Sequence, residues 1–228
     1  MLTKKKKISK KEIKEDKLVT FVYKAQSFYE EYQKTIIIAG IAIVAVAAIA
    51  YWYLNQKASA NEQAGIELAR VMKSFDQGAY LEAIEGKQGS NIMGLKKIVE
   101  DYGDTENGET AKIYLADAYS YLGNYEEAFK YYKDYDGSID LFKATALAGQ
   151  AGYYAYKKDY KKAAELYLQA ANVTELNAQN PDYLLDAAIN FINAGDKEQA
   201  KVLLDKINTD YKSSPVNREV SKYLALVQ

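Results

Sequence analysis

The chain has 228 residues, with 30 basic and 31 acidic side chains, and it contains neither cysteine nor histidine. This composition excludes disulfides, thiolate nucleophiles, Cys/His metal sites, histidine general bases and a cysteine-linked lipid anchor. Two prolines and 13 glycines among 49% apolar residues favour a helical protein.

Charge is distributed unevenly along the chain. Residues 1–34 contain ten lysines and five acidic residues, whereas residues 35–56 carry no charge. The remaining residues, 57–228, contain 20 basic and 26 acidic side chains. A basic tail, an uncharged apolar run and an acidic domain are typical of a protein with one membrane anchor.

The apolar run Ile36–Leu54 reads IIIAGIAIVAVAAIAYWYL. As a helix it extends about 28 Å, close to the thickness of the hydrocarbon core. We therefore predict a transmembrane helix over residues 35–56. Aromatic residues at its end favour the headgroup level, namely Tyr51, Trp52 and Tyr53.

A cleaved signal peptide is the alternative interpretation of this run, since Ala58–Ala60 offers a small-x-small site. The long basic region before it and the length of the apolar run favour an uncleaved anchor instead. Because the lysines precede the run, we expect a cytoplasmic N-terminus and a C-terminal domain across the membrane.

The basic tail, residues 1–34, has two features of its own. The run Lys4–Lys7 could bind nucleic acid or act as a localisation signal, but beside a span it favours the anionic lipid of the inner leaflet. An apolar stripe at helical spacing predicts a juxtamembrane amphipathic helix that docks on lipid or on a partner. Its residues are Leu18, Phe21, Val22, Ala25, Phe28, Tyr29 and Tyr32.

The rest of the chain contains an internal repeat. One pattern recurs at residues 111–132, 147–170 and 183–207, with successive copies 35 and 37 residues apart. Such a period, with small and large residues alternating on paired helices, is typical of tetratricopeptide (TPR) repeats. Aligned positions are Gly123, Lys158 and Gly195 at the turn, Ala116, Ala151 and Ala188 in the first helix, and Ala128, Ala163 and Ala200 in the second.

A divergent copy precedes these three. It aligns Gly78, Tyr80 and Ala83 with the turn and second helix, has extra residues around 86–91, and has a predicted second helix over 92–102. We therefore predict an all-α fold, a TPR helical-hairpin solenoid preceded by a single transmembrane helix. A connecting helix and the divergent repeat would occupy residues 57–108, and three TPR-like repeats with a C-terminal cap would occupy 109–228.

The sequence contains no pattern that indicates catalysis. There is no phosphate-binding loop, no dinucleotide fingerprint and no histidine for a metal. We expect no catalytic residues, metal, cofactor or small-molecule substrate. Nucleic acid is disfavoured as a partner because residues 57–228 are acidic.

A repeat scaffold of this kind binds proteins, usually on the concave face formed by its first helices. The repeat alignment predicts a mixed, uncharged, tyrosine-containing groove for an apolar or extended segment. Its residues are Ile113, Asp117, Ser120, Tyr121, Ala148, Gly152, Tyr156, Leu185, Ile189 and Asn193. Several of them could instead pack the superhelix, and the chain's own C-terminus could occupy the groove.

The layout resembles the YfgM-like ancillary subunits of the bacterial SecYEG translocon. The likeness lies in FYEEYQKTIIIAG at 28–40, YWYLNQ at 51–56 and the helix through Ala64 and Leu68 to Gly78. The resemblance implies an inner-membrane protein with a periplasmic domain, next to the translocon and a PpiD-type chaperone. Residues 95–119 also resemble TPR lipoproteins of outer-membrane assembly, but there is no cysteine for the lipid.

Three hypotheses follow. The first is a non-enzymatic adaptor that binds partner proteins or emerging secretory chains near the export channel. The second is a structural or assembly subunit of another bacterial inner-membrane complex. The third, with reversed topology, is a tethered cytoplasmic cochaperone, and the lysine distribution disfavours it.

Overall fold

The computed structural model describes residues 10–227, with side chains from Lys17 to Val227. These residues form helices joined by turns, with an isolated antiparallel bridge between Gly86 and Met93. The chain divides after Gln56 into two compact units. The lysine run at 4–7 lies outside the described residues.

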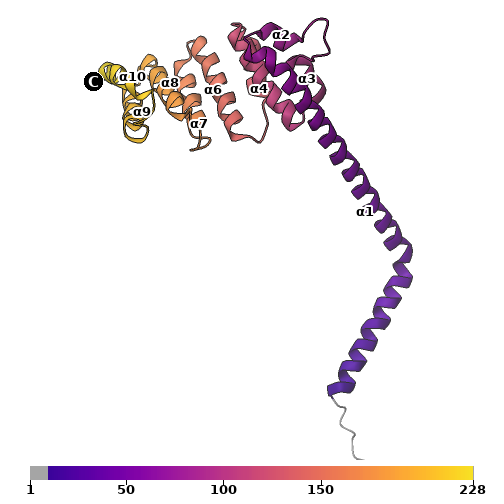
Figure 1. Cartoon of the computed structure of the whole chain (residues 1–228). Coiled ribbons are helices and arrows are strands. Elements are labelled where there is room, and N and C mark those ends of the chain that lie inside the picture. Colours follow the sequence, from indigo (N-terminus) through magenta and orange to yellow (C-terminus); the bar gives the residue numbers. More distant parts are fainter. Residues whose placement is uncertain (1–9, 228) are drawn as a thin grey trace, which may run out of the picture. The chain divides into compact units, whose positions relative to one another are not determined.

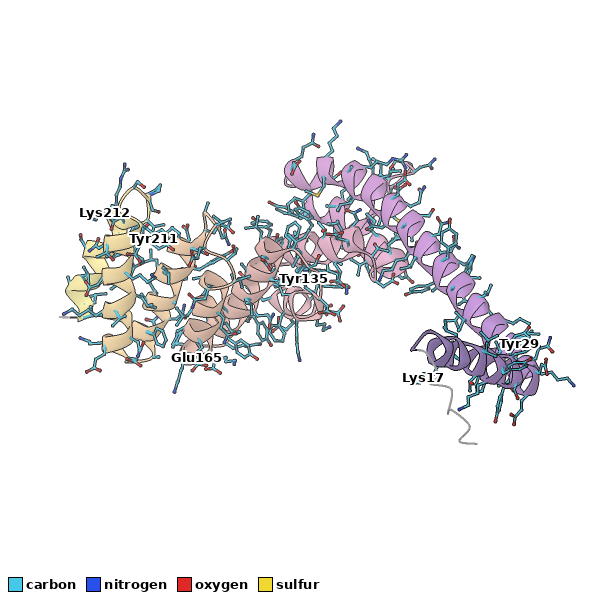
Figure 2. All side chains as sticks on the ribbon, turned by 90° about the horizontal axis from the view of Figure 1, so that it is seen from below. Lys17, Tyr29, Tyr135, Glu165, Tyr211 and Lys212 are labelled. Carbon is cyan, nitrogen blue, oxygen red and sulfur yellow. The ribbon has the colours of Figure 1, made fainter. Side chains whose placement is uncertain are left out.

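The first unit contains the N-terminal part of helix α1, Lys10–Asp76. Every side chain from Lys17 to Gln56 is exposed, and those near Lys17 and Tyr29 stand outward from the helix (Figure 2). The helix contains a window of mean hydropathy 2.4, long and apolar enough to cross a membrane. A fully exposed apolar helix of this length agrees with the predicted span by length and composition.

The second unit begins at Lys57 and is a series of helical hairpins (Figure 1). Helix α4 pairs with α5, α6 with α7 and α8 with α9, and α10 packs on α9 and α8. The bounds are α2 Tyr80–Glu85, α3 Leu95–Tyr102, α4 Glu106–Tyr121, α5 Tyr125–Asp134, α6 Asp140–Tyr156, α7 Tyr160–Ala171, α8 Asn180–Asn193, α9 Lys197–Asp210 and α10 Asn217–Val227.

Alanines lie where the helices of each hairpin approach most closely. In the first helices, Ala116, Ala151 and Ala188 are completely buried. In the second helices, the aligned alanines 128, 163 and 200 are buried as well. A larger side chain at these positions would push the paired helices apart, because interiors are close-packed.

The turns between paired helices share one backbone conformation. The turn residue has a φ of 77° at Gly123, 63° at Lys158 and 84° at Gly195, as the alignment predicted. The amide of the next residue donates to the carbonyl five positions back, at 2.9 Å in each of the three turns. This is the Schellman pattern, in which a left-handed residue closes the first helix.

The last part of α1 belongs to the second unit and begins the divergent repeat. Leu68 and Val71 pack in one buried cluster with Ile84 of α2 and Leu95 of α3. The side-chain Oδ1 of Asn61 accepts a hydrogen bond from the Asn107 backbone amide at 2.8 Å. The backbone carbonyl of Asn61 accepts a second one from Asn107 Nδ2 at 2.9 Å.

The second helix of the divergent repeat differs from the prediction. Instead of one helix over 92–102, a short α2 precedes the Gly86–Met93 bridge, and α3 begins at Leu95. Gly94 has an extended ψ of 158°, and a Cβ there would collide with the backbone of Ile84 and Glu85. The bridge therefore holds residues 92–94 in an extended conformation that delays the start of the helix.

The turn residue Lys158 provides the first prediction. A side chain at positive φ costs about 1–2 kcal/mol, partly offset by the unfolded-state entropy that glycine adds. Lys158→Gly should therefore stabilise the chain by about 0.5–1 kcal/mol, raising Tm by roughly 1–4 °C. Thermal unfolding of the full chain in detergent, followed by circular dichroism, measures this shift.

Two variants serve as controls for this prediction. Lys158→Ala removes the long side chain but keeps the Cβ, so it should leave Tm nearly unchanged. Gly123→Ala has open space around the added Cβ, so it should lower Tm through backbone strain alone. Equal effects of Lys158→Gly and Lys158→Ala on Tm would contradict the claim that the Cβ at positive φ is the source of the strain.

Candidate functional site

A tyrosine-lined hollow of about 370 Å³ lies among helices α4, α5, α6 and α7. Four rings line it, those of Tyr125, Tyr153, Tyr156 and Tyr167. The other lining residues are small: Ser120, Ala128, Ala148, Gly149 and Gly152. No lining residue is formally charged, so the hollow presents aromatic surface and hydroxyl groups.

Glycines of α6 form the floor of this hollow. A Cβ at Gly149 would overlap the ring of Tyr132, which reaches over from α5. At Gly152 the nearest atom to an added Cβ is the Tyr167 hydroxyl, at 3.5 Å. Gly149 therefore permits a close approach of Tyr132, whereas an added Cβ at Gly152 would make only an ordinary van der Waals contact.

Aromatic and cation–π contacts hold the rings of the hollow in place. Tyr125 and Tyr156 lie 4.8 Å apart between ring centroids, and Tyr153 stacks on Phe129 at 4.2 Å. Lys157 Nζ lies 5.4 Å and 5.1 Å from the ring centroids of Tyr153 and Tyr156. Aromatic pairs and cation–π contacts of this geometry each contribute about 0.5–1.5 kcal/mol.

A buried polar cluster lies beside the hollow. Tyr132 Oη donates to Asp117 Oδ1 at 2.5 Å and lies 3.5 Å from Ser120 Oγ. Burial raises the pKa of Asp117, and the bond from Tyr132 partly opposes this shift. Burial and the charge of Asp117 raise the pKa of Tyr132, so its hydroxyl remains protonated and donates. Asp117 is therefore occupied within the chain rather than presented to a ligand.

The predicted groove residues separate into four groups. Ser120, Ala148, Gly152 and Tyr156 line the hollow. Asp117 is bonded to Tyr132, and Tyr121 stacks on Tyr80 with centroids 4.6 Å apart. Ile113 and Leu185 are 1% and 7% exposed, so the expectation that they line a groove is wrong: both pack in the core. On α8, Ile189 is half-buried and Asn193 is exposed, outside the hollow.

Sequence reasoning missed the tyrosines Tyr125, Tyr153 and Tyr167. Tyr125 and Tyr167 belong to second helices, whose aligned positions predicted only packing within the repeat. In Figure 2, Tyr135 at the end of α5 and Glu165 on α7 mark the second helices on either side of α6. The abundance of tyrosine, at 22 residues, was the signal that could have indicated them.

The predicted docking residues all lie on α1 in the first unit and are exposed. They are Leu18, Phe21, Val22, Phe28, Tyr29, Tyr32, Tyr51, Trp52 and Tyr53. The rings of Phe28 and Tyr32 are in contact, with centroids 4.8 Å apart. Their exposure leaves the stripe available to lipid or to a partner helix, and their docking role stays a prediction.

Asp186 of α8 is an acidic group that sequence reasoning did not single out. Burial, followed by the charges of Asp182 and Glu219, raises its pKa to about 6. Its charge in turn adds to burial in raising the pKa of Tyr167, a wall of the hollow. Among the described residues no group of His, Cys, Asp or Glu could hold a metal ion.

Comparison with known proteins gives a structural relative. No protein-family model and no curated protein sequence matches the chain. The structure is similar to the nearly identical TPR-like repeats of a kinesin light chain from Podospora anserina. The TM-score is 0.56 at 15% identity, covering 73% of this chain and 85% of the other. The predicted TPR-like helical solenoid is therefore confirmed as the fold.

The two glycines on the floor of the hollow should respond oppositely to alanine. Gly149→Ala should destabilise the chain by about 1–3 kcal/mol, because the methyl group overlaps the Tyr132 ring. Gly152→Ala should be neutral or stabilising by up to about 1 kcal/mol, through better helix propensity. Urea unfolding of both variants measures the difference, and similar effects at the two positions would contradict the packing described.

Asp186 should make stability depend on pH. Its folded-state pKa of about 6 exceeds the ordinary 3.8, so folding favours the protonated carboxyl. The stability gained in this way is fully present below about pH 4, where Asp186 is protonated. That contribution is lost as the pH rises through 6. Asp186→Asn should therefore raise Tm at pH 7 relative to wild type and leave it nearly equal at pH 4.

The matched control for this prediction is Asp182→Asn, one helical turn away and exposed. It should keep most of the pH dependence, because burial is the largest cause of the Asp186 shift. If Asp186→Asn leaves the difference in Tm between pH 4 and pH 7 unchanged, Asp186 is not its source.

Proposed function

We propose that this chain is a non-enzymatic, membrane-anchored adaptor whose TPR-like repeats bind partner proteins or emerging secretory chains near the protein-export channel. The observation that carries the proposal is the uncharged tyrosine-lined hollow on a TPR-like solenoid. This fold is typically a scaffold for protein–protein interaction, and repeat scaffolds bind through extended surfaces of this kind.

The anchor is the apolar part of α1. Its length, its mean hydropathy of 2.4 and its exposed side chains support a membrane span. The lysines before it support a cytoplasmic N-terminus and an extracytoplasmic repeat domain in a bacterial inner membrane. The sequence resemblance to YfgM-like subunits supports translocon subunits, a periplasmic chaperone or secretory chains as partners.

A second candidate function is a structural subunit of another inner-membrane complex. The exposed stripe of α1 favours it, because residues such as Phe28 and Tyr32 could dock on a partner helix as well as on lipid. In this case the same fixed neighbours would contact both the stripe and the repeats.

Photo-crosslinking in native membranes tests the adaptor and separates the two functions. Probes would replace Tyr121 and Tyr156 in the repeats and Phe28 in the stripe. We expect crosslinks from Tyr156 to secretory chains or a periplasmic chaperone, and from Phe28 to translocon subunits. A probe at exposed Lys201 on α9 serves as the background control. Crosslinks to one fixed, unrelated membrane complex would contradict the adaptor and support the structural subunit.

A further inference from the structure

The hydroxyl groups of the hollow are its most informative feature. Among the described residues, no hydrogen bond joins the hydroxyls of Tyr125, Tyr153, Tyr156 or Tyr167 to another protein group. The nearest carboxylate on α4, Asp117, already accepts from Tyr132. The hollow therefore combines aromatic faces with unused hydroxyl donors and lacks a charged group of its own.

We propose that this hollow binds a proline-rich, extended segment of a partner protein. This inference rests on the proposed function and adds the chemistry of the segment that is bound. It is distinct from the binding of a helix, of a charged terminus or of the chain's own C-terminal residues.

The first argument for a proline-rich segment is that its hydrogen-bonding groups complement those of the hollow. A polyproline II segment has no internal hydrogen bonds, and its prolines have carbonyl acceptors but no N–H donors. Such a segment requires donors from its binding site and leaves no donor of its own unsatisfied. The tyrosine hydroxyls of the hollow provide those donors, and no carboxylate lines it to compete for them.

The second argument is the shape of the hollow. Tyr125 and Tyr156 are tilted by 43° to each other, which leaves ring faces that are not covered by parallel stacking. The pyrrolidine rings of proline pack against aromatic faces in grooves that recognise proline-rich segments. The small floor residues Gly152 and Ala148 allow a backbone to approach closely. Because the segment is already extended, it loses little conformational entropy on binding.

Other occupants fit the lining less well. An amphipathic helix inserts leucine-like side chains into an aliphatic groove, whereas the aliphatic lining here is Ala128 and Ala148. An acidic segment would need a free cation, but Lys157 already pairs with Glu126 at 2.7 Å. The chain itself has only two prolines, and one of them, Pro181, is buried in α8.

Fluorescence anisotropy with labelled decaproline tests the inference, using the full chain in detergent micelles. Tyr156→Ala should weaken binding at least about tenfold, because a stacking ring and a donor are both lost. Tyr121→Ala is the matched control, since Tyr121 is 65% exposed and Tyr156 is 54% exposed, but Tyr121 lies outside the hollow. That variant should bind within about twofold of wild type.

A second variant separates donors from packing. Tyr125→Phe combined with Tyr156→Phe keeps both rings and removes two hydroxyls, so folding is preserved. Each lost hydrogen bond costs about 1 kcal/mol, so affinity should fall roughly tenfold or more. Unchanged affinity in this double variant would show that the hydroxyls do not recognise the segment and would overturn the inference.

Two comparison peptides test whether the hollow prefers a proline-rich segment to a flexible or a helical one. A Gly-Ser peptide of equal length and a leucine-rich amphipathic peptide should each bind at least about tenfold more weakly than decaproline. Equal or tighter binding of either one, or no binding of decaproline, would overturn the inference. Tyr156 crosslinks to a partner segment without proline would also overturn it while leaving the adaptor intact. Absence of any protein crosslink from Tyr156 would contradict the adaptor function itself.

Discussion

Close crossing of two helices within each hairpin is the constraint on which the rest of the solenoid depends. It is achieved with completely buried alanines, Ala116, Ala151 and Ala188, and with a left-handed residue that closes each first helix. Since the crossing has room only for a methyl group, the large side chains of the second helices lie between neighbouring repeats. Tyr125 and Tyr167 of the hollow belong to second helices, and Tyr153 and Tyr156 belong to the first helix α6.

Helix α6 differs from α8 at two positions that lie in or beside the hollow. At the two positions where α6 has Gly149 and Gly152, the aligned residues of α8 are Asp186 and Ile189. Helix α8 therefore has larger side chains at both positions, one of them a carboxylate. On α6, Gly149 admits the ring of Tyr132 and Gly152 lines the hollow without a side chain, at the cost of helix propensity.

The repeats, their turns and their alanine crossings could be predicted from the sequence because each depends on local spacing. Even Lys158, a residue that normally avoids positive φ, was placed correctly by alignment with Gly123 and Gly195. The start of α3 was not predictable, because the bridge between Gly86 and Met93 competes with helix propensity.

The lining of the hollow could be predicted from the sequence only in part, for a physical reason. Of the inward positions counted on the first helices, Ser120, Ala148, Gly152 and Tyr156 lie in the hollow, and their role in binding stays a prediction. The count failed for Ile113 and Leu185, because the burial of a position depends on how far neighbouring second-helix side chains reach over it. Tyr132 is an example: its ring extends from one repeat to Gly149 of the next. Helical periodicity gives no indication of such a contact between repeats.

Recovery of partner proteins with the full chain from native membranes tests the role of the hollow most directly, when wild type is compared with Tyr156→Ala and Tyr121→Ala. We expect the same proteins to accompany the wild type and Tyr121→Ala and to be lost from Tyr156→Ala, with all three chains equally folded. Equal recovery with Tyr156→Ala would contradict the claim that the tyrosine-lined hollow is where this protein binds its partners.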